Sequence, residues 1–487
     1  MDREHFEHYL SDTSRRGPAA DDAFTGAAGG AACGDLSRIS FRVEDGRITA
    51  VSFDAEGCGA MVAATAAVAE AIDGAPVLDA ARLSIDGVEA LLGGLIPAKR
   101  HAAQLASDAL HRGLSAAAGS GLPLALARTP TAAPERVAVA MSGGVDSAVA
   151  ALLERERGAD VIAITVKLWA DPETDGTKAC CSPEAVIGAR ELALSLGMPH
   201  FTLDLEQDFR RRVVDRFVSG YADGKTPNPC ILCNGEVRLA AMIDLAERLG
   251  ASRLLTGHYA RIVEDEDGPL LAAGADPAKD QSYMLAALPP ELLGRLGFPL
   301  TELTKPEVRA IAARHGLAVA KKAESQDLCF LAGQGKRGFL RRHGGLEDRE
   351  GDVLDSSGRA VGSHPGHHNF TVGQRRGTGV SLNAPAYVLA TDAVTNTVTV
   401  GTRDELVTHH VSVCDAVLHR EGARVDAVRL RYRSRPLPAS IGSADPGRHK
   451  ALEVELGEEF AGASPGQTAV LLEGETIVGH GTIAAAA

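Results

Sequence analysis

A strand, a glycine-containing turn and a helix follow one another at residues 136–157, and this segment limits the possible folds more than any other. Apolar segments that suit strands then alternate with segments of helical period. In order, these are a strand at 161–168, a helix at 182–196, a short strand near 201–205, a helix after Asn234 and a strand at 253–256. Parallel strands need crossover connections, which are usually helices. The alternation therefore predicts a doubly wound parallel sheet.

The turn at residues 140–147 (AMSGGVDS) has the features of an anion-binding loop. Gly143 and Gly144 allow backbone N–H groups to close on an anion, and the N-terminus of the following helix adds partial positive charge. The loop lacks the lysine of the G-x-x-x-x-G-K-[ST] motif. It therefore favours a pyrophosphate held by backbone and hydroxyl groups. The alternative is an ordinary strand-to-helix turn in which Asp146 and Ser147 only cap the helix.

The regions on either side predict other kinds of domain. Residues 36–54 alternate apolar and polar side chains about a short turn, which predicts a β-hairpin, and residues 59–73 and 98–115 have a helical period. Residues 115–135 are rich in Gly, Pro, Ser and Ala, which indicates a linker. Near the C-terminus, short alternating segments with glycine turns, such as 386–401 and 451–483, predict small β domains.

The net charge of −14, from 50 Lys+Arg and 64 Asp+Glu, argues against a general polyanion binder such as a DNA-binding protein. The charge is uneven, because residues 321–450 carry +5. Alternation along a strand would place Arg429, Arg431, Arg433 and Arg435 on one face, which predicts a phosphate-contacting surface or merely a solvated basic strand. The sequence contains no run of about 18 apolar residues and no secretory signal. We therefore expect a cytoplasmic protein with no membrane partner.

Eight cysteines in 487 residues are too few for a disulfide scaffold, so metal or redox chemistry is the better expectation for paired cysteines. Cys230 and Cys233 form a C-x-x-C pair. Adjacent thiols rarely chelate one metal well, so we expect Cys180 and Cys181 to be structural. Cys414 stands alone in an apolar segment and is expected to lie in the core.

The anion-binding loop and five later motifs resemble, in order and spacing, the tRNA 2-thiouridylases of the PP-loop ATP pyrophosphatase superfamily. The five motifs are TPNPCILCN (226–234), TGHY (256–259), KDQSY (279–283), SQDLCF (325–330) and TVGQRRGTG (371–379). The resemblance covers roughly residues 136–487. It implies adenylation of the wobble uridine O2 by ATP with Mg²⁺, then sulfur transfer that yields 2-thiouridine, AMP and pyrophosphate. It also implies two partners, tRNA and a cysteine desulfurase or other sulfur donor.

The functional positions of that family are carried over by matching motifs. The residues that resemble its ATP-binding elements are Ala140, Met141, Ser142, Gly143, Gly144, Val145, Asp146, Ser147, Val166 and Gly257. The residues that resemble its contacts to tRNA or to the target base are Asn228, Pro229, Cys230, Lys279, Asp280, Gln281, Arg431 and Tyr432. Cys233 matches the nucleophilic cysteine, and Cys329 matches the cysteine that carries persulfide sulfur.

Cys230 departs from the family pattern, because many members have Asp at this position. With Cys233 and Cys329 it provides three thiolates, which could hold three irons of a 4Fe–4S cluster and leave the fourth iron open to sulfide. The competing interpretation keeps Cys329 as the persulfide carrier and Cys233 as the attacking thiol. Cys230 would then be a bystander or a resolving cysteine.

The first 120 residues resemble the NifU/IscU-type iron–sulfur scaffolds. The ligand set of these scaffolds matches Cys33, Asp35, Cys58 and His101, but Ala102 stands where a third cysteine is expected. The four residues could still bind zinc or a labile iron–sulfur cluster. The missing thiol puts the assembly of new clusters in doubt. The fusion implies local delivery of sulfur or iron–sulfur, and the alternative is a degenerate domain kept for folding or docking.

These observations together predict a multidomain α/β protein. Its parts are an α+β NifU/IscU-like domain (1–118), a linker (119–135), a doubly wound PP-loop domain (136–328), a central β-rich tRNA-binding domain (329–402) and a C-terminal β-barrel-like domain (403–487). Two rival functions remain. A PP-loop ligase or amidotransferase for a small carboxylate or carbonyl would have no use for three thiols, and no glutaminase-like segment is evident. An iron–sulfur carrier without activity would leave the nucleotide loop unexplained.

Overall fold

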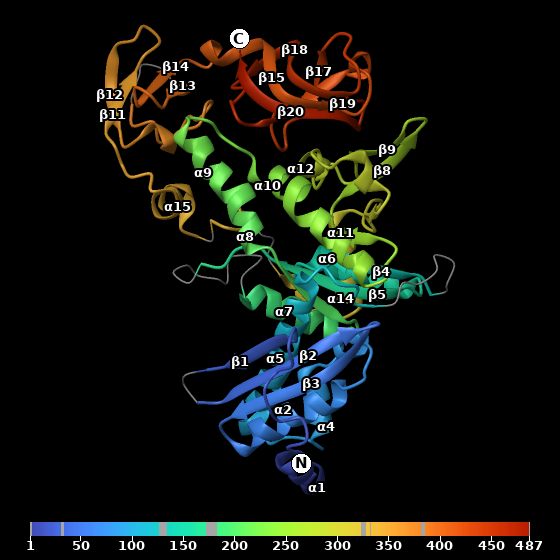
Figure 1. The fold of residues 1–487 in the computed structure, drawn as a ribbon. Helices are drawn as coiled ribbons and strands as arrows, with labels where there is room; N and C mark the ends of the chain where they lie inside the picture. The colour runs from blue at the N-terminus through green and yellow to red at the C-terminus, as the bar shows by residue number, and fades with distance from the viewer. Residues whose placement is uncertain are drawn as a thin grey trace.

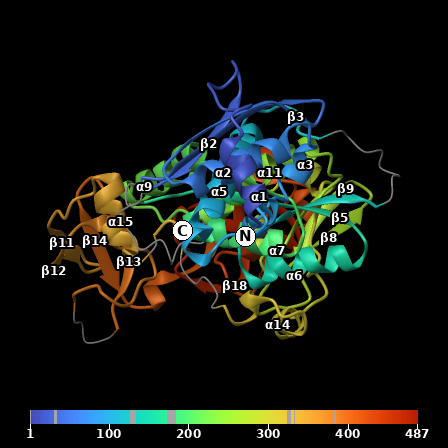
Figure 2. The same ribbon diagram turned by 90° about the horizontal axis from the view of Figure 1, so that it is seen from below.

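The computed structural model describes residues 2–30, 34–125, 134–171, 183–322, 328–331, 333–380 and 385–486. The molecule is elongated (Figure 1). The N-terminal domain and the C-terminal β barrel lie at opposite ends, and the α/β domain lies between them. A small central β domain projects to one side, as the view from below also shows (Figure 2).

The N-terminal domain packs helices against a three-stranded antiparallel sheet. The strands are β1 (Phe24–Gly29), β2 (Leu36–Glu44) and β3 (Arg47–Glu56), and the helices are α1 (Arg3–Ser11), α2 (Gly59–Ile72), α3 (Val77–Ala80), α4 (Ile85–Leu91) and α5 (Arg100–Gly119). The predicted hairpin is confirmed, because Glu44 pairs with Arg47 and the turn residues Asp45 and Gly46 adopt left-handed φ angles of 50° and 73°. Both predicted helices are present as α2 and α5.

The middle domain contains the predicted parallel sheet, with strand order β10-β7-β4-β5-β6. Its strands are β4 (Arg136–Ala140), β5 (Asp160–Lys167), β6 (His200–Asp204), β7 (Leu254–Thr256) and β10 (Leu296–Gly297), and its main helices are α6 (Val145–Glu156), α7 (Pro183–Ser195), α11 (Leu239–Arg248) and α14 (Lys305–Arg314). The chain leaves β4 toward β5 on one side and later returns to β7 on the other. The end of β4 is therefore the topological switch point, where open α/β sheets bind ligands.

A run of helical segments leads from β6 toward the C-terminal domain (Figure 1). It comprises α8 (Glu206–Phe209), the π-helical turn η3 (Arg210–Val214), α9 (Asp215–Ala222), α10 (Pro229–Leu232) and a second π-helical turn, η4 (Cys233–Arg238). Shorter elements complete this region: α12 (Ser282–Leu285), α13 (Pro290–Leu293), the 3₁₀ turn η5 (Ala318–Lys321) and α15 (Gly335–Gly344). Single π turns inside helices occur frequently at functional sites.

Two β domains follow, as predicted. The central domain has the strand order β12-β11-β14-β13, formed by β11 (Gly351–Leu354), β12 (Ala360–His364), β13 (Tyr387–Asp392) and β14 (Thr397–Gly401). The C-terminal domain is a barrel closed by pairing of β15 with β20. Its strands are β15 (Val407–Leu418), β16 (Ala427–Arg429), β17 (Leu437–Ser440), β18 (Gly447–Ala461), β19 (Thr468–Glu473) and β20 (Thr476–Ala486).

The hairpin β8 (Ala260–Asp265) and β9 (Gly268–Ala273) belongs to the middle domain in chain order but joins the sheet of the C-terminal barrel. Ala272 pairs with Thr476 of β20, and the Arg420 side chain of the barrel binds the Asp265 carboxylate. This shared sheet is not evident from the sequence. It fixes the barrel to the middle domain.

Two sequence predictions in the C-terminal domain are wrong. The sequence predicts one strand that carries Arg429, Arg431, Arg433 and Arg435, but β16 ends at Arg429. Arg433 has a left-handed φ of 62°, so the backbone turns there and the strand does not continue. Cys414 lies in β15 but is only half-buried, because it faces away from the core residue Val413. Cys180 and Cys181 lie outside the described residues.

The N-terminal domain is joined to the middle domain by a continuous hydrophobic core. One cluster includes Leu110 and Leu114 of α5 together with Phe201 of β6. The buried Arg190 side chain forms an ion pair with the half-buried Asp108 across the boundary, and the Arg248 guanidinium donates to the Ala118 carbonyl at 2.7 Å. The N-terminal domain is therefore docked in a fixed orientation.

Candidate active site

The anion-binding loop lies between β4 and α6 and is held by its own hydroxyls. The Ser142 N–H donates to Ser147 Oγ at 3.1 Å, and Ser147 Oγ donates to the Gly144 carbonyl at 3.2 Å. Gly143 has a φ of +65°, which favours glycine. Gly257 packs against the first turn of α6 so closely that a Cβ would lie 2.7 Å from the Ser147 nitrogen. Only glycine fits there without movement.

A cavity of about 170 Å³ opens at this loop. Seven of the predicted nucleotide-binding residues line it: Ala140, Met141, Ser142, Asp146, Ser147, Val166 and Gly257. The other lining residues are Thr165, Arg238, Met242, Thr256, His258 and Gln281. Gly143, Gly144 and Val145 form the loop backbone beside the cavity. The structure thus brings together the residues that the sequence assigns to ATP.

Asp146 is the one carboxylate among the described lining residues, and it is held from two sides. Lys305 Nζ lies 2.7 Å from both of its oxygens, and the Tyr259 hydroxyl donates to it at 2.8 Å. Lys305 lies at the start of α14 and its side chain is 9% exposed. A buried lysine far along the chain thus reaches a loop that has no lysine of its own.

The thiol-bearing segment begins directly after Asn228. The Asn228 side chain accepts hydrogen bonds from the N–H groups of Cys230 and Ile231 and so caps α10. Pro229 is buried, Cys230 is half-buried and Cys233 is 8% exposed. The C-x-x-C pair therefore spans the start of a helix whose backbone is already fixed.

Cys329 lies on a short described segment, residues 328–331, that is anchored by an aromatic cluster. The next residue, Phe330, is buried against Phe209, Phe217 and Phe339, with ring centroids 4.9–5.8 Å apart. Cys329 itself is half-buried and packs against the same core cluster as Cys233.

The loop that leads to Asn228 lies where three domains meet. The Thr226 N–H donates to the Pro465 carbonyl of the barrel at 2.8 Å, and the Thr226 hydroxyl donates to Thr371 of the central domain at 3.3 Å. The Arg431 guanidinium donates to backbone carbonyls of both domains, those of Val372 and Gly462. Residues predicted to contact the target base thus lie at a three-domain junction.

The other predicted tRNA contacts have varied surroundings. The Asp280 side chain is 6% exposed and forms an ion pair with Arg429, whereas Lys279 is half-buried. Gln281 lines the cavity at the anion-binding loop and accepts a hydrogen bond from the Tyr259 N–H. Tyr432 packs near Tyr283, with ring centroids 6.1 Å apart.

In the N-terminal domain, Asp35, Cys58 and His101 offer ligand atoms that all lie within 4.8 Å of one another. His101 Nε2 is 2.8 Å from the Asp35 carboxylate, and the Cys58 N–H donates to it at 2.9 Å. Burial acts to raise the pKa of Asp35, but the hydrogen bonds from Cys58 and His101 outweigh it, so the pKa is lowered. Cys33 lies outside the described residues, and Ala102 is fully buried in the core.

Zinc ligands lie 2.0–2.3 Å from the ion, so two ligands of one ion are at most about 4.6 Å apart. The ligand atoms of Asp35, Cys58 and His101 lie within 4.8 Å of one another, which is close to this limit. This trio is the one such group found among the described residues, and Cys230, Cys233 and Cys329 do not form another. The three thiols are therefore not arranged around a single ion.

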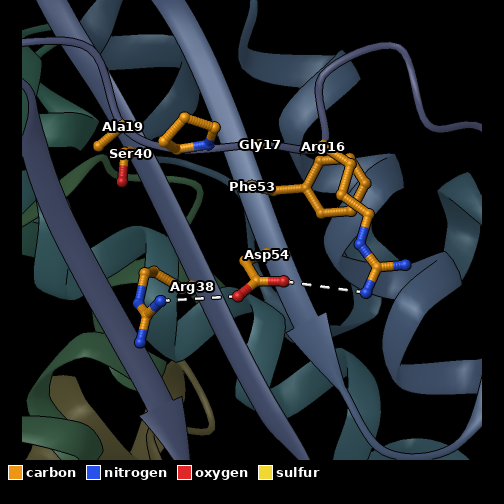
Figure 3. A pocket seen from close by; sticks show the side chains of 8 residues that line it. Arg16, Gly17, Ala19, Arg38, Ser40, Phe53 and Asp54 are labelled. Atoms are coloured by element: carbon orange, nitrogen blue, oxygen red, sulfur yellow. Dashed lines mark ion pairs between the residues drawn. The ribbon is translucent and has the colours of Figure 1, made fainter.

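A second cavity, of about 350 Å³, lies on the N-terminal domain and does not include this trio. Figure 3 shows Asp54 between Arg38 and Arg16, with ion-pair distances of 3.6 and 3.8 Å. The two cations share one carboxylate, so part of their charge is already balanced. This cavity is not the metal site that the sequence predicts.

Comparison with known proteins decides the family. A curated relative from Rubrobacter xylanophilus, "Bifunctional protein NifU/MnmA", is 42% identical over 98% of this chain and 97% of its own length. The chain belongs to the bifunctional NifU/MnmA family. This confirms both resemblances that the sequence motifs indicate. A "tRNA-specific 2-thiouridylase MnmA" from Acidithiobacillus ferrooxidans is 43% identical over 72% of this chain and 99% of its own length.

Four family models match in succession along this NifU/MnmA chain. They are described as NifU-like N terminal domain (3–119), tRNA methyl transferase HUP domain (135–333), tRNA methyl transferase PRC-barrel domain (337–402) and Aminomethyltransferase beta-barrel domain (403–483). The solved structure of an iron–sulfur assembly scaffold from Fervidobacterium islandicum covers 22% of the chain at 18% identity and a TM-score of 0.19. In the described ranges, no helix has the length and apolar character that crossing a bilayer requires.

Sequence motifs missed three side chains of the cavity region: Arg238, His258 and Lys305. His258 lies within the quoted TGHY motif, but its role becomes visible only through its partners. Arg238 and Lys305 reach the cavity through the fold, from a π turn and from the start of α14. No local pattern marks either residue.

Proposed function

We propose that this chain is a tRNA-uridine 2-sulfurtransferase that adenylates uridine O2 with ATP and then replaces that oxygen with sulfur. Family membership supports the reaction class. One structural observation carries the assignment to this site: the cavity at the anion-binding loop is linked to the second thiol of the C-x-x-C pair by the helical turn η4, which begins at Cys233 and ends at Arg238 in the cavity wall.

In the first step, uridine O2 attacks the α-phosphorus of ATP and pyrophosphate leaves. The loop N–H groups and the N-terminus of α6 favour the pyrophosphate. Mg²⁺ bound with the nucleotide would have Asp146 as its carboxylate ligand in the cavity. The resulting C2–O–P linkage converts the oxygen into part of an AMP leaving group.

In the second step, the terminal sulfur of a Cys329 persulfide attacks C2, and the C2–O2 bond breaks as AMP leaves with the oxygen. The Cys233 thiolate then attacks Cys329 Sγ, and the electrons of the broken S–S bond pass to the sulfur on C2. The products are 2-thiouridine and a Cys233–Cys329 disulfide. An external thiol reductant restores the two thiols.

Cys230 keeps a second route open. Three thiolates have the right chemistry for three irons of a 4Fe–4S cluster, which places thiolates farther apart than a single ion does. Iron and acid-labile sulfide analysis of anaerobically purified protein distinguishes the routes. Colourless protein that thiolates tRNA, with activity retained in Cys230→Ala, supports the persulfide route. The cluster route is supported if wild type contains stoichiometric iron and if Cys230→Ala loses both the iron and the activity.

For the N-terminal domain, we propose that Asp35, Cys58 and His101, with Cys33, bind zinc or iron and that the domain supplies sulfur to the thiols. The donor set and the 4.8 Å spacing support a metal site. Full-length Cys58→Ser is expected to lose the metal and to thiolate more slowly when the sulfur donor is limiting. Metal content is measured directly, so this proposal can fail independently of the reaction.

The decisive experiment is appearance of 2-thiouridine in tRNA, measured by nucleoside mass spectrometry with ATP and a sulfur donor. Cys233→Ser and Cys329→Ser are expected to abolish it, while the matched control Cys414→Ser, on the barrel, retains it. Product without ATP, or unchanged rates in both active-site variants, would contradict the proposal.

A further inference from the structure

Arg238 occupies a position that links the two halves of the proposed site. It is the last residue of η4, which begins at Cys233, and it lines the cavity at the anion-binding loop. It is thus a cation in the cavity wall on the element that carries the nucleophile. None of the nucleotide-binding motifs includes it.

The guanidinium of Arg238 is oriented by a neutral histidine. An Arg238 NH2 group donates to His258 Nε2 at 3.1 Å. Burial, and then the charge of Arg238, lower the pKa of His258 to about 3, so the ring is neutral at working pH. Because arginine can only donate, Nε2 accepts and Nδ1 carries the proton, which is donated to Thr256 Oγ1 at 2.8 Å.

The hydrogen bond to His258 fixes the position of the guanidinium but does not neutralise its charge. No carboxylate of the described residues lies within 4.0 Å of Arg238, and the neighbouring Glu236 pairs with Arg216 instead. Arg238 Nε is buried and has no hydrogen-bond partner among the described residues. The other charged lining residue, Asp146, is already bound by Lys305. A half-buried cation with a buried, unused donor calls for an anionic ligand.

The position of this pair within the cavity selects one part of the nucleotide. Thr256 lies beside Ala140 in the sheet, and Gly257 contacts the first turn of α6. The Arg238–His258 pair therefore lies at the phosphate end of the cavity. Arg238 reaches the cavity on η4, the element that begins at Cys233. In the proposed reaction, the N–H groups of the anion-binding loop hold the pyrophosphate on the other side. The α-phosphate must lie between these two sides, because uridine O2 attacks it there.

We propose that Arg238 binds the α-phosphate of ATP and remains on it through adenylation and AMP departure, with His258 as its positioning residue. This inference rests on the proposed function. When O2 bonds to the α-phosphorus and the bond to pyrophosphate breaks, Arg238 stabilises the negative charge that builds on the α-oxygens. When sulfur displaces the oxygen from C2, the same contact stabilises the AMP anion. No proton or electron passes through Arg238.

The test is Arg238→Gln in the full chain, assayed by tRNA-dependent pyrophosphate release and by 2-thiouridine formation. We expect kcat for pyrophosphate release to fall about 100- to 1000-fold, as on removal of one transition-state donor, with KM for ATP changed less than about fivefold. Arg238→Lys is expected to recover part of the loss. The matched control Arg155→Gln, on an exposed part of α6, is expected to match wild type.

ATPαS, in which sulfur replaces one α-oxygen of ATP, provides a second test. A merely structural role of Arg238 would not affect how the enzyme discriminates between the two ATPαS diastereomers. Wild type is expected to discriminate against one ATPαS diastereomer, and Arg238→Gln should lose most of that discrimination. A folded Arg238→Gln with kcat within threefold of wild type, or with full discrimination, would overturn the inference. If wild type makes no 2-thiouridine, the proposed function itself fails, which is a different outcome.

Discussion

Gly257→Ala isolates the contact between the TGHY segment and the anion-binding loop. The added Cβ would lie 2.7 Å from the Ser147 nitrogen and 2.8 Å from the Asp146 carbonyl carbon, whereas ordinary contacts begin at 3.4 Å. The first turn of α6 or residues 256–258 must therefore move by about 0.7 Å. Both neighbours are backbone atoms, so no flexible side chain can absorb the shift.

Overpacking of this kind costs about 1–3 kcal/mol of stability, and a displacement near 1 Å at a reacting group costs on the order of 100-fold in rate. We expect Gly257→Ala to lower kcat/KM for ATP about 10- to 100-fold in the thiolation assay and to lower the unfolding midpoint in urea. The matched control is Gly188→Ala on α7, where a Cβ meets nothing within 4 Å. There, alanine is expected to be neutral or stabilising by up to about 1 kcal/mol. A kcat/KM for ATP and an unfolding midpoint of Gly257→Ala equal to those of wild type would refute this reasoning.

Three further predictions concern the N-terminal domain. Arg190→Met leaves the half-buried Asp108 carboxylate without its partner and should destabilise the docked domain by about 3 kcal/mol in urea unfolding. Adding Asp108→Leu should recover most of the loss, and additive effects of the two substitutions would contradict this. Burial, with Arg190 nearby, lowers the pKa of His111 to about 3, and burial also lowers that of His200. The unfolded chain therefore binds more protons than the folded chain below pH 6.5, so stability should fall as pH drops from 6.5 toward 4; a flat urea midpoint over that range would argue against the buried pair. His101→Ala should weaken zinc or iron binding at least 10-fold by calorimetry without changing ATP affinity, and an unchanged metal affinity would exclude it as a ligand.

Local sequence patterns predicted the elements whose formation depends on neighbours in the chain. The β4–α6 segment is specified by an apolar strand, two glycines and a hydroxyl that closes the loop on itself. The N-terminal hairpin is specified by alternation and by Asp45 and Gly46, which accept left-handed φ angles. In both cases the stabilising contacts lie within a few residues of one another.

Contacts made across long stretches of chain could not be predicted in the same way. Lys305 meets Asp146 only after the sheet and α14 have assembled, and Arg238 needs His258, which lies 20 residues farther along the chain. The proposed basic strand failed because Arg433 turns the backbone, a reversal that alternation of side chains does not reveal. The sequence showed correctly that this segment is rich in arginine, but it did not show that the backbone changes direction there.

The continuous core between α5 and β6 has a kinetic consequence. Carrier domains that shuttle a reactive group usually swing on a flexible tether, so the encounter is intramolecular and independent of concentration. Here a swing would first have to expose Leu110, Leu114 and Phe201 to water, at a cost of roughly 2 kcal/mol for each large side chain. The proposed sulfur transfer from the site of Asp35, Cys58 and His101 is therefore expected to occur between molecules or through a diffusible carrier, and its rate should rise with enzyme concentration.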